Sequence, residues 1–345
     1  MATNGNANVF YRPVPFDSVS CGPSAFPVIS EVDDFALSKL LVDRGAKLIP
    51  SEVDKRPLNC AIELVTGVLN KLREGDAEMS DINVVGPFAK GTSLAIERSV
   101  DLVVTLKSLP TQDSMSTRGE KFCEVMKMNP ACQFLIFEKQ DNGFEVRDPT
   151  VNVSLRVMFT VPINLFREHK ADVHVDKAIL MEASKALRRT GWFISRSKRS
   201  ALENFVRILL DVKRRFAGLQ ALQDWHLELY AYHSLSGMTA NGQPISLAQA
   251  FKRFFQLFSA GALLPDAPTL ADPVLTGPGS TKENLTCCYT LEQLDEICQA
   301  AQTICRLIMM GSFYEVLGVT PLAEGDARLF SQKAYNPEDD DSAKQ

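Results

Sequence analysis

The stretch of sequence that decides the fold covers residues 84–106 and reads V-V-G-P-F-A-K-G-T-S-L-A-I-E-R-S-V-D-L-V-V-T-L. It contains a glycine turn, a second glycine followed by two hydroxyl residues, and an aspartate that leads an apolar run. Gly86-(x4)-Gly91-Thr92-Ser93 has the skeleton of a P-loop, but threonine replaces the lysine that would contact the outer phosphates. The stronger apolar strand also follows the glycines instead of preceding them. We therefore reject a P-loop.

A nucleotidyltransferase explains the same spacing better. In its signature, a Gly-Ser turn opens a short helix, and a later strand carries aspartates as D-x-D, with a third carboxylate on a neighbouring strand. The turn holds the triphosphate, and the three carboxylates bind two Mg²⁺ ions that bridge the attacking and leaving oxygens. Here Thr92 and Ser93 lie where the short helix is expected to start, and Asp101 opens the strand expected at 102–106.

The order G-T-S-L-A, then D-L-V-V-T-L-K-S-L-P-T, resembles the DZF family (the domain associated with zinc fingers). The resemblance extends over most of the chain through P-F-D at 15–17, A-F-P at 25–27, T-V-P at 160–162, G-W-F at 191–193, F-Q-L-F-S-A-G-A-L-L-P at 255–265, T-L-E-Q-L-D at 290–295 and A-Q-T-I-C-R-L at 301–307. It implies a lobe with the oligoadenylate-synthetase kind of nucleotidyltransferase fold. Without zinc-finger cysteines or a double-stranded-RNA-binding module, the chain is similar to the DZF-only members.

The family's catalytic residues are largely absent when they are carried over position by position. Active relatives have D-x-D-L-V-V on the metal strand, where this chain has Ser99-Val100-Asp101. The third carboxylate should lie on the strand expected at 153–161, which carries Arg156 and no acid, and an Arg at that place opposes cation binding. Pro87 replaces the serine of the phosphate turn and has no backbone N–H.

The resemblance therefore implies a pseudo-enzyme that retains one of three metal-binding carboxylates. We expect no catalytic residue, no bound metal and no cofactor, with at most weak binding of nucleotide. The vestigial nucleotide pocket would consist of Gly86, Thr92, Ser93 and Asp101.

Three other acids could replace the missing carboxylates: Glu97, Glu145 and Asp148. We expect all three on the surface, since single exposed acids are the norm. If Glu97 or Asp148 pointed into the cleft, the interpretation of the protein as catalytically inactive would be weaker.

The predicted fold is of the α+β class, with a nucleotidyltransferase-like mixed α/β lobe at 31–165 followed by an all-helical, dimerising lobe at 166–322. Residues 1–30 form an extended arm whose aromatic residues are too many for a free tail, so part of it should pack on the body. Residues 323–345 form an acidic disordered tail with E-D-D-D at 338–341.

Periodicity predicts the individual elements. Helices are expected at 35–41, 58–72, 114–128, 175–190, 200–216, 222–235, 246–260, 290–310 and 312–318. Strands are expected at 82–85, 102–106, 134–137, 144–146 and 151–161. The D-N-G sequence at 141–143 predicts a hairpin turn, and 261–286 predicts a long surface loop.

Composition limits the classes of function. The 345 residues include 37 basic and 42 acidic side chains, a net charge of −5, whereas a dedicated nucleic-acid binder usually has a basic excess. The eight cysteines form no C-x-x-C pair, so we expect buried, reduced thiols. No segment predicts a signal peptide or a membrane span. We expect no membrane association and a nuclear protein, with shuttling to the cytoplasm as a further option.

A local basic cluster on the helices at 183–215 has two readings, contact with RNA phosphates or an ordinary solvated face. Its members are Lys185, Arg188, Arg189, Arg196, Lys198, Arg199, Arg207, Lys213, Arg214 and Arg215. Arg196, Lys198 and Arg199 are the candidate phosphate contacts.

Two further features carry alternatives. Phe251, Phe254, Phe255 and Phe258 place apolar side chains on more than one helix face, so the helix is either buried on all sides or an interface for another DZF chain. The resemblance favours the interface. His226 and His233 are seven apart, which is not a helical metal-pair spacing, so packing or a solvent face is favoured.

The resemblance implies a non-catalytic subunit that heterodimerises with a larger DZF protein carrying double-stranded-RNA-binding or zinc-finger domains. Such a complex regulates transcription and RNA metabolism (mRNA stability, splicing, translation) in the nucleoplasm, and the partner contributes most of the RNA and DNA binding. The alternatives are an active template-independent nucleotidyltransferase and a direct RNA binder that uses the basic helices.

Overall fold

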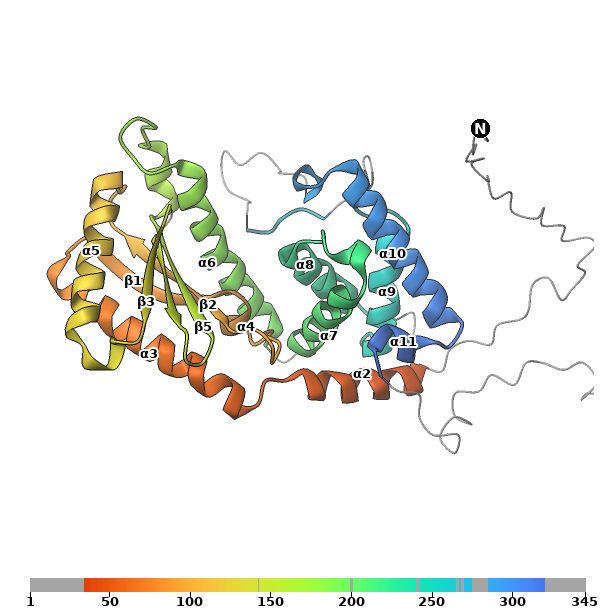
Figure 1. Cartoon of the computed structure of the whole chain (residues 1–345). Coiled ribbons are helices and arrows are strands. Elements are labelled where there is room, and N and C mark those ends of the chain that lie inside the picture. Colours follow the sequence, from red (N-terminus) through yellow and green to blue (C-terminus); the bar gives the residue numbers. More distant parts are fainter. Residues whose placement is uncertain are drawn as a thin grey trace, which may run out of the picture.

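The computed structural model describes residues 34–319 apart from 142, 199–200, 240–241, 265–266, 268–269 and 275–284. The expected arm at 1–30, the acidic tail and most of the loop expected at 261–286 lie outside the described residues, as does the middle of the D-N-G turn. Figure 1 shows a sheet-containing lobe beside a helical lobe.

The described elements follow the predicted order, except that the short helix expected to start at Thr92 lies earlier, at Gly86–Lys90. They are α2 (Asp34–Leu48), α3 (Glu52–Gly75), β1 (Met79–Val85), α4 (Gly86–Lys90), β2 (Ser99–Leu106), α5 (Gln112–Met128), β3 (Ile136–Gln140), β4 (Gly143–Asp148), β5 (Val153–Thr160), α6 (Lys177–Ser197), α7 (Leu202–Arg215), α8 (Asp224–Leu235), α9 (Leu247–Ser259), α10 (Leu291–Met309) and α11 (Phe313–Leu317), with short 3₁₀ turns at Pro130–Cys132, Ile163–Arg167, Ala217–Leu219 and Leu285–Cys288.

The five-stranded sheet has the order β1-β2-β5-β4-β3. Strands β2 and β5 are parallel, and the other neighbours are antiparallel. On one face, alternate residues such as Leu102, Val104 and Val157 join a large core with α3 and α5. On the other face, Val103 and Met158 pack against Ala183 of α6. Because α6 covers only part of that face, the polar ends of β2 and β5 remain accessible.

Helix α3 shows how local sequence sets the boundaries. Ser51 and Asp54 form a capping box, in which the Ser51 hydroxyl accepts from the Asp54 amide at 3.2 Å and the Asp54 carboxylate accepts from the Ser51 amide at 3.0 Å. Within the helix expected at 58–72, Leu58, Val65 and Leu69 are all buried under the sheet.

The helical lobe packs α8, α9, α10 and α11 with α7 around a second large core. The four phenylalanines of α9 lie inside it, each at most 2% exposed. The rings of Phe254 and Phe258 are 4.8 Å apart, and Phe254 also meets Phe205 of α7 edge-on. The predicted interface role for these side chains is therefore wrong, because α9 is enclosed within its own lobe.

The predicted lobe boundary at residue 165 also needs correction. Helix α2 belongs with the helical lobe, since Leu37 and Leu41 are fully buried in that lobe's core. Helix α6 lies against the sheet (Figure 1). Apolar periodicity identifies an amphipathic helix but does not say which core the helix covers.

Two expectations from composition can be compared with the structure. All six cysteines whose side chains are described are free thiols; Cys132 and Cys298 are buried, but Cys60 and Cys288 are exposed, so burial holds only in part. Within the described residues, no helix is both long and apolar enough to cross a membrane.

Candidate nucleotide cleft

The glycine turn places its backbone directly beside the metal strand. Gly86 has φ 75° at the junction of β1 and α4, and a Cβ added there would lie 3.4 Å from the Asp101 carboxylate. Its amide N–H donates to the hydroxyl of Thr190 on α6 at 3.1 Å. Pro87 follows at the start of α4 and has no N–H to donate. The turn therefore offers little to a phosphate.

Asp101 is paired with a cation from the neighbouring strand. The parallel register sets Asp101 of β2 opposite Arg156 of β5. The Arg156 guanidinium donates from Nε to one carboxylate oxygen at 3.0 Å and from Nη2 to the other at 2.9 Å. Such a bidentate pair has a planar geometry that a metal ion would have to disrupt. Half of the Arg156 side chain is exposed, so the pair lies at the open part of the sheet.

The residues present do not fit a pair of Mg²⁺ ions. Ser99, at the first aspartate position, lies opposite Ser154, and Arg156 occupies the register position opposite Asp101. The remaining carboxylate has a positive guanidinium within hydrogen-bonding distance, which opposes cation binding. Among the described residues, no group of three or more His, Cys, Asp or Glu side chains is placed to hold a metal ion.

None of the three substitute acids joins Asp101. Glu145 lies opposite Arg156 on β4, but its carboxylate accepts from Arg147 at 3.0 Å, and this hydrogen bond lowers the pKa of Glu145. Asp148 caps a turn by accepting from the Thr150 amide at 2.9 Å.

Glu97 is not the solvated side chain that the sequence suggested. Burial raises its pKa, and its carboxylate accepts from the Leu94 amide at 3.2 Å and lies 3.6 Å from Arg214. It lines a separate pocket beyond the turn.

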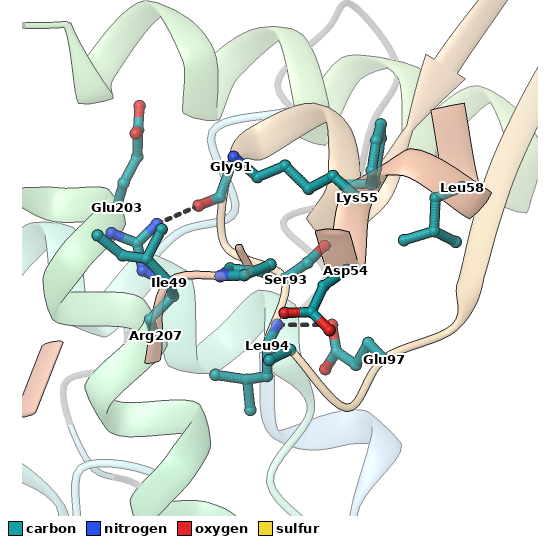
Figure 2. A pocket seen from close by; sticks show the side chains of 13 residues that line it. Ile49, Asp54, Lys55, Leu58, Gly91, Ser93, Leu94, Glu97, Glu203 and Arg207 are labelled. Carbon is teal, nitrogen blue, oxygen red and sulfur yellow. Dashed lines mark hydrogen bonds between the residues drawn. The ribbon is translucent and has the colours of Figure 1, made fainter. Parts of the chain in front are cut away.

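The four predicted residues of the vestigial pocket lie in three separate places. Gly86 and Asp101 meet at the open sheet face. Thr92 is fully buried, and its amide donates to the Pro87 carbonyl at 3.0 Å, so this residue serves the turn itself. Ser93 lies in the separate pocket with Glu97 (Figure 2).

That pocket has a volume of about 350 Å³ and lies between the α2–α3 junction, the loop after α4, and α7 (Figure 2). Arg207 of α7 donates to the Gly91 carbonyl across it at 2.6 Å. The lining residues are Ile49, Pro50, Asp54, Lys55, Leu58, Phe88, Gly91, Ser93, Leu94, Ala95, Glu97, Glu203 and Arg207.

A buried ion pair joins the glycine-turn helix to the helical lobe. Lys90, the last residue of α4, lies 2.7 and 2.9 Å from the two carboxylate oxygens of Glu228 on α8. Both side chains are buried, and the ammonium lies 5.7 Å from the Phe193 ring and 5.9 Å from the Trp225 ring. Sequence reasoning missed this pair; the only signal was a glutamate inside the apolar run W-H-L-E-L-Y.

The predicted basic cluster is largely committed to intramolecular contacts. Lys213 pairs with Asp224, Arg214 with Glu97, and Arg215 with Asp211. Arg189 pairs with Glu182 and Asp272, while Arg188 donates to the Val274 carbonyl. Arg207 is buried in the pocket described above.

Of the three candidate phosphate contacts, two are described. Arg196 lies 5.8 Å from the Tyr232 ring, and Lys198 is exposed at the end of α6. Arg199 lies outside the described residues.

His226 and His233 do not form a metal pair. The buried His226 ring contacts the Tyr289 hydroxyl through Nδ1, and desolvation with the nearby Arg189 lowers the pKa of His226 to about 4. His233, two turns further along α8, is exposed.

Comparison with known proteins matches this arrangement to a family. Residues 2–198 match the DZF N-terminal domain and residues 201–334 match the DZF C-terminal domain. The division between them follows α6, in agreement with the packing of α6 on the sheet.

Solved structures show the same fold at low sequence identity. The Cid1 poly(U) polymerase with Mg and 3′-dATP bound is 13% identical, covers 84% of this chain and 100% of its own, and has a TM-score of 0.59. CdnC from E. coli MS115-1 with ATP is 15% identical, covers 82% of this chain and 98% of its own, and has a TM-score of 0.54. These similarities show a nucleotidyltransferase-like fold. The two domain matches, over residues 2–198 and 201–334, show that the chain belongs to the DZF family.

Proposed function

We propose that this chain is a non-catalytic DZF-only subunit. It heterodimerises with a larger DZF protein that carries double-stranded-RNA-binding or zinc-finger domains. Through that partner it regulates transcription and RNA metabolism, including mRNA stability, splicing and translation, in the nucleus.

The observation that carries the non-catalytic part is the Asp101–Arg156 pair. Two-metal phosphoryl transfer needs carboxylates that neutralise and position two divalent cations. Here both oxygens of the one retained carboxylate accept hydrogen bonds from a guanidinium, and the Gly86 amide is engaged by Thr190. The alternative of an active nucleotidyltransferase would require a metal to displace Arg156.

The partner's role in nucleic-acid binding is supported by charge. The chain has a net charge of −5, and most members of its basic cluster pair with acids or carbonyls of the same chain. A cation already paired and partly buried contributes little to counterion release from RNA. The direct RNA-binding alternative then rests on Arg196, Lys198 and Arg199. If the partner instead contributes most of the RNA binding, charge reversal at Lys198 and Arg199 should leave the RNA affinity of the heterodimer nearly unchanged.

A restoration experiment tests the non-catalytic claim. We expect the wild-type chain to transfer no labelled nucleotide to RNA in Mg²⁺ or Mn²⁺, and its melting temperature should not respond to either ion. The double variant Ser99→Asp, Arg156→Asp places acids at both missing positions. It should be less stable without metal because three carboxylates repel one another, and Mg²⁺ should raise its melting temperature. Metal-dependent transfer by the wild type that Asp101→Ala abolishes would overturn the proposal.

Purification tests the heterodimer. The tagged chain isolated from cells should bring down one stoichiometric DZF partner that withstands washing in high salt. Recovery of the chain as a monomer would count against the subunit role while leaving the metal result intact.

A further inference from the structure

The pocket of Figure 2 is built from both lobes. Ile49 and Pro50 come from the α2–α3 junction, Phe88 and Ser93 from α4 and the loop after it, and Glu203 from α7. None of the lining residues belongs to β2 or β5, so the pocket is separate from the place of the missing metal ions. Its volume of about 350 Å³ is within the range of small-molecule sites, about 300–1,000 Å³.

Much of the wall of this pocket is apolar. Leu58 and Leu94 are 4% and 3% exposed, and each also belongs to the hydrophobic core of its lobe. The apolar lining residues are Ile49, Pro50, Leu58, Phe88, Leu94 and Ala95. Such walls favour a ligand that carries an apolar stem or ring, because its burial removes apolar surface from water.

The cationic side chains of the pocket already have acceptors within the chain. Arg207 is buried and donates to a main-chain carbonyl at 2.6 Å. The Lys55 ammonium lies 3.1 Å from the Glu52 carboxylate. One lining acid is compensated in the same way, because the Asp54 carboxylate accepts from Arg98 at 3.2 Å. These groups therefore need no ligand to balance their charge.

Two other lining carboxylates keep acceptor oxygens without a donor. Among the described residues, no hydrogen bond or ion pair reaches the Glu203 carboxylate. One oxygen of Glu97 accepts from the Leu94 amide, but the other lies 3.6 Å from Arg214, too far for a hydrogen bond. Burial raises the pKa of Glu97, so these two neighbours do not fully compensate its charge. The pocket therefore lacks a positive hydrogen-bond donor.

We propose that this pocket binds a small organic cation, a guanidinium or amidinium group attached to an apolar stem or ring. A planar group of this kind brings several N–H donors and one positive charge to Glu97, Glu203 and the Ser93 hydroxyl. Its stem or ring lies against the apolar walls while the charged end meets the carboxylates. An anionic ligand is disfavoured, because it would be repelled by both carboxylates.

Three ligands of nearly equal shape test the proposal on the full-length chain. Benzamidine is cationic, benzamide is neutral and benzoate is anionic. Benzamidine should bind saturably in calorimetry and raise the melting temperature, since it binds only the folded chain. Benzamide should bind at least about tenfold more weakly, because it lacks the charge-assisted hydrogen bonds, and benzoate should not bind. Equal binding of all three, or no saturable binding of benzamidine at millimolar concentrations, would overturn the proposal.

Substitutions locate the cation within the molecule. Glu97→Gln should weaken benzamidine binding by about tenfold and leave benzamide binding unchanged, because only the charge is removed. Glu203→Gln gives a second, independent test should the first variant fold poorly, as judged by its melting temperature without ligand. Ala95→Phe fills the pocket and should abolish binding of both ligands.

The matched control is Asp101→Asn, which removes a carboxylate from the vestigial cleft and leaves the pocket intact. It should not change the affinity for benzamidine. If Asp101→Asn weakened benzamidine binding while Glu97→Gln and Glu203→Gln did not, the cation would lie in the cleft and the assignment to this pocket would be wrong.

Discussion

Replacement of Lys90 by methionine should be among the most destabilising single changes on the surface between the lobes. Lys90 is 8% exposed and Glu228 is 2% exposed, so neither charge has water as an alternative partner. Burial already raises the pKa of Glu228, with Lys90 acting against that shift. Removal of one partner leaves a buried carboxylate alone, which costs about 3–5 kcal/mol of unfolding free energy.

The double variant Lys90→Met, Glu228→Leu should recover most of that loss. The ammonium lies close to the rings of Phe193 and Trp225, so a methionine at position 90 has apolar neighbours. Exchange of a buried ion pair for apolar side chains of similar volume is often neutral or stabilising. Lys55→Met is the matched control, because Lys55 pairs with the exposed Glu52 within one helix and should contribute less than about 0.5 kcal/mol.

The assay is denaturant unfolding followed by tryptophan fluorescence. Both tryptophans of the chain report on this junction, since the rings of Trp192 and Trp225 are 5.3 Å apart and Lys90 lies beside Trp225. The deficit of Lys90→Met should shrink at acidic pH. Because burial raises the pKa of Glu228 in the folded protein, the folded state is most stable relative to the unfolded state below the unfolded-state pKa of this carboxyl. That stability is lost as the pH rises through the folded-state pKa of Glu228.

Three results would refute this reasoning. A loss below about 1 kcal/mol for Lys90→Met would mean that the Glu228 carboxylate finds water or another donor. A double variant as unstable as the single one would mean that the methionine packs badly, independently of charge. A deficit that grows on acidification would contradict the assigned direction of the Glu228 pKa.

Three further predictions concern single residues. His226 has a folded-state pKa of about 4 against an ordinary value of 6.5, so its contribution to the free energy of unfolding is present above pH 6.5 and is lost as the pH falls toward 4, by up to about 3 kcal/mol. NMR titration of the ring checks the pKa, and unfolding experiments with His226→Gln as the control check the loss of stability. Phe254→Ala should cost about 3–5 kcal/mol in denaturant unfolding because the buried ring packs on Phe205 of α7 and Phe258 of its own helix; loss of partner binding with unchanged stability would instead favour an interface role for Phe254. Thr190→Val removes the acceptor of the Gly86 amide and should cost about 1–3 kcal/mol in the same assay, whereas Thr190→Ser should retain most of it; equal effects of the two changes would show that the hydroxyl is not the cause.

The sequence predicted the fold well where one local pattern suffices. The strand at 102–106 and the helix at 58–72 are confirmed because a short apolar run and the helical period can each be read directly from the order of residues. The predicted helix starts at 246 and 290 coincide with the capping residues Ser246 and Thr290, whereas α3 begins at Glu52, six residues before its predicted start.

Contacts between distant segments were harder to predict. The phenylalanines of α9 look the same in sequence whether a neighbouring helix of the same chain or another protein covers them. Lys90 and Glu228 are 138 positions apart, and neither belongs to a pattern that points to the other. The sequence identified the two strands that carry Asp101 and Arg156. It did not predict the register that places these two residues opposite each other, which is seen in the sheet.

Two charged pairs, Lys90–Glu228 and Asp101–Arg156, connect the stretch 84–106 to the rest of the fold. A lone Asp101 at the edge of the cleft would repel any neighbouring acid, and Arg156 neutralises it across the parallel strands. Lys90 lies in the helix that a phosphate turn normally presents to a nucleotide, yet its ammonium is buried against Glu228 of the other lobe. Both cations therefore contribute to tertiary structure. An acid introduced at position 156 should restore affinity for metal at the expense of stability, whereas changes at Lys90 should alter stability alone.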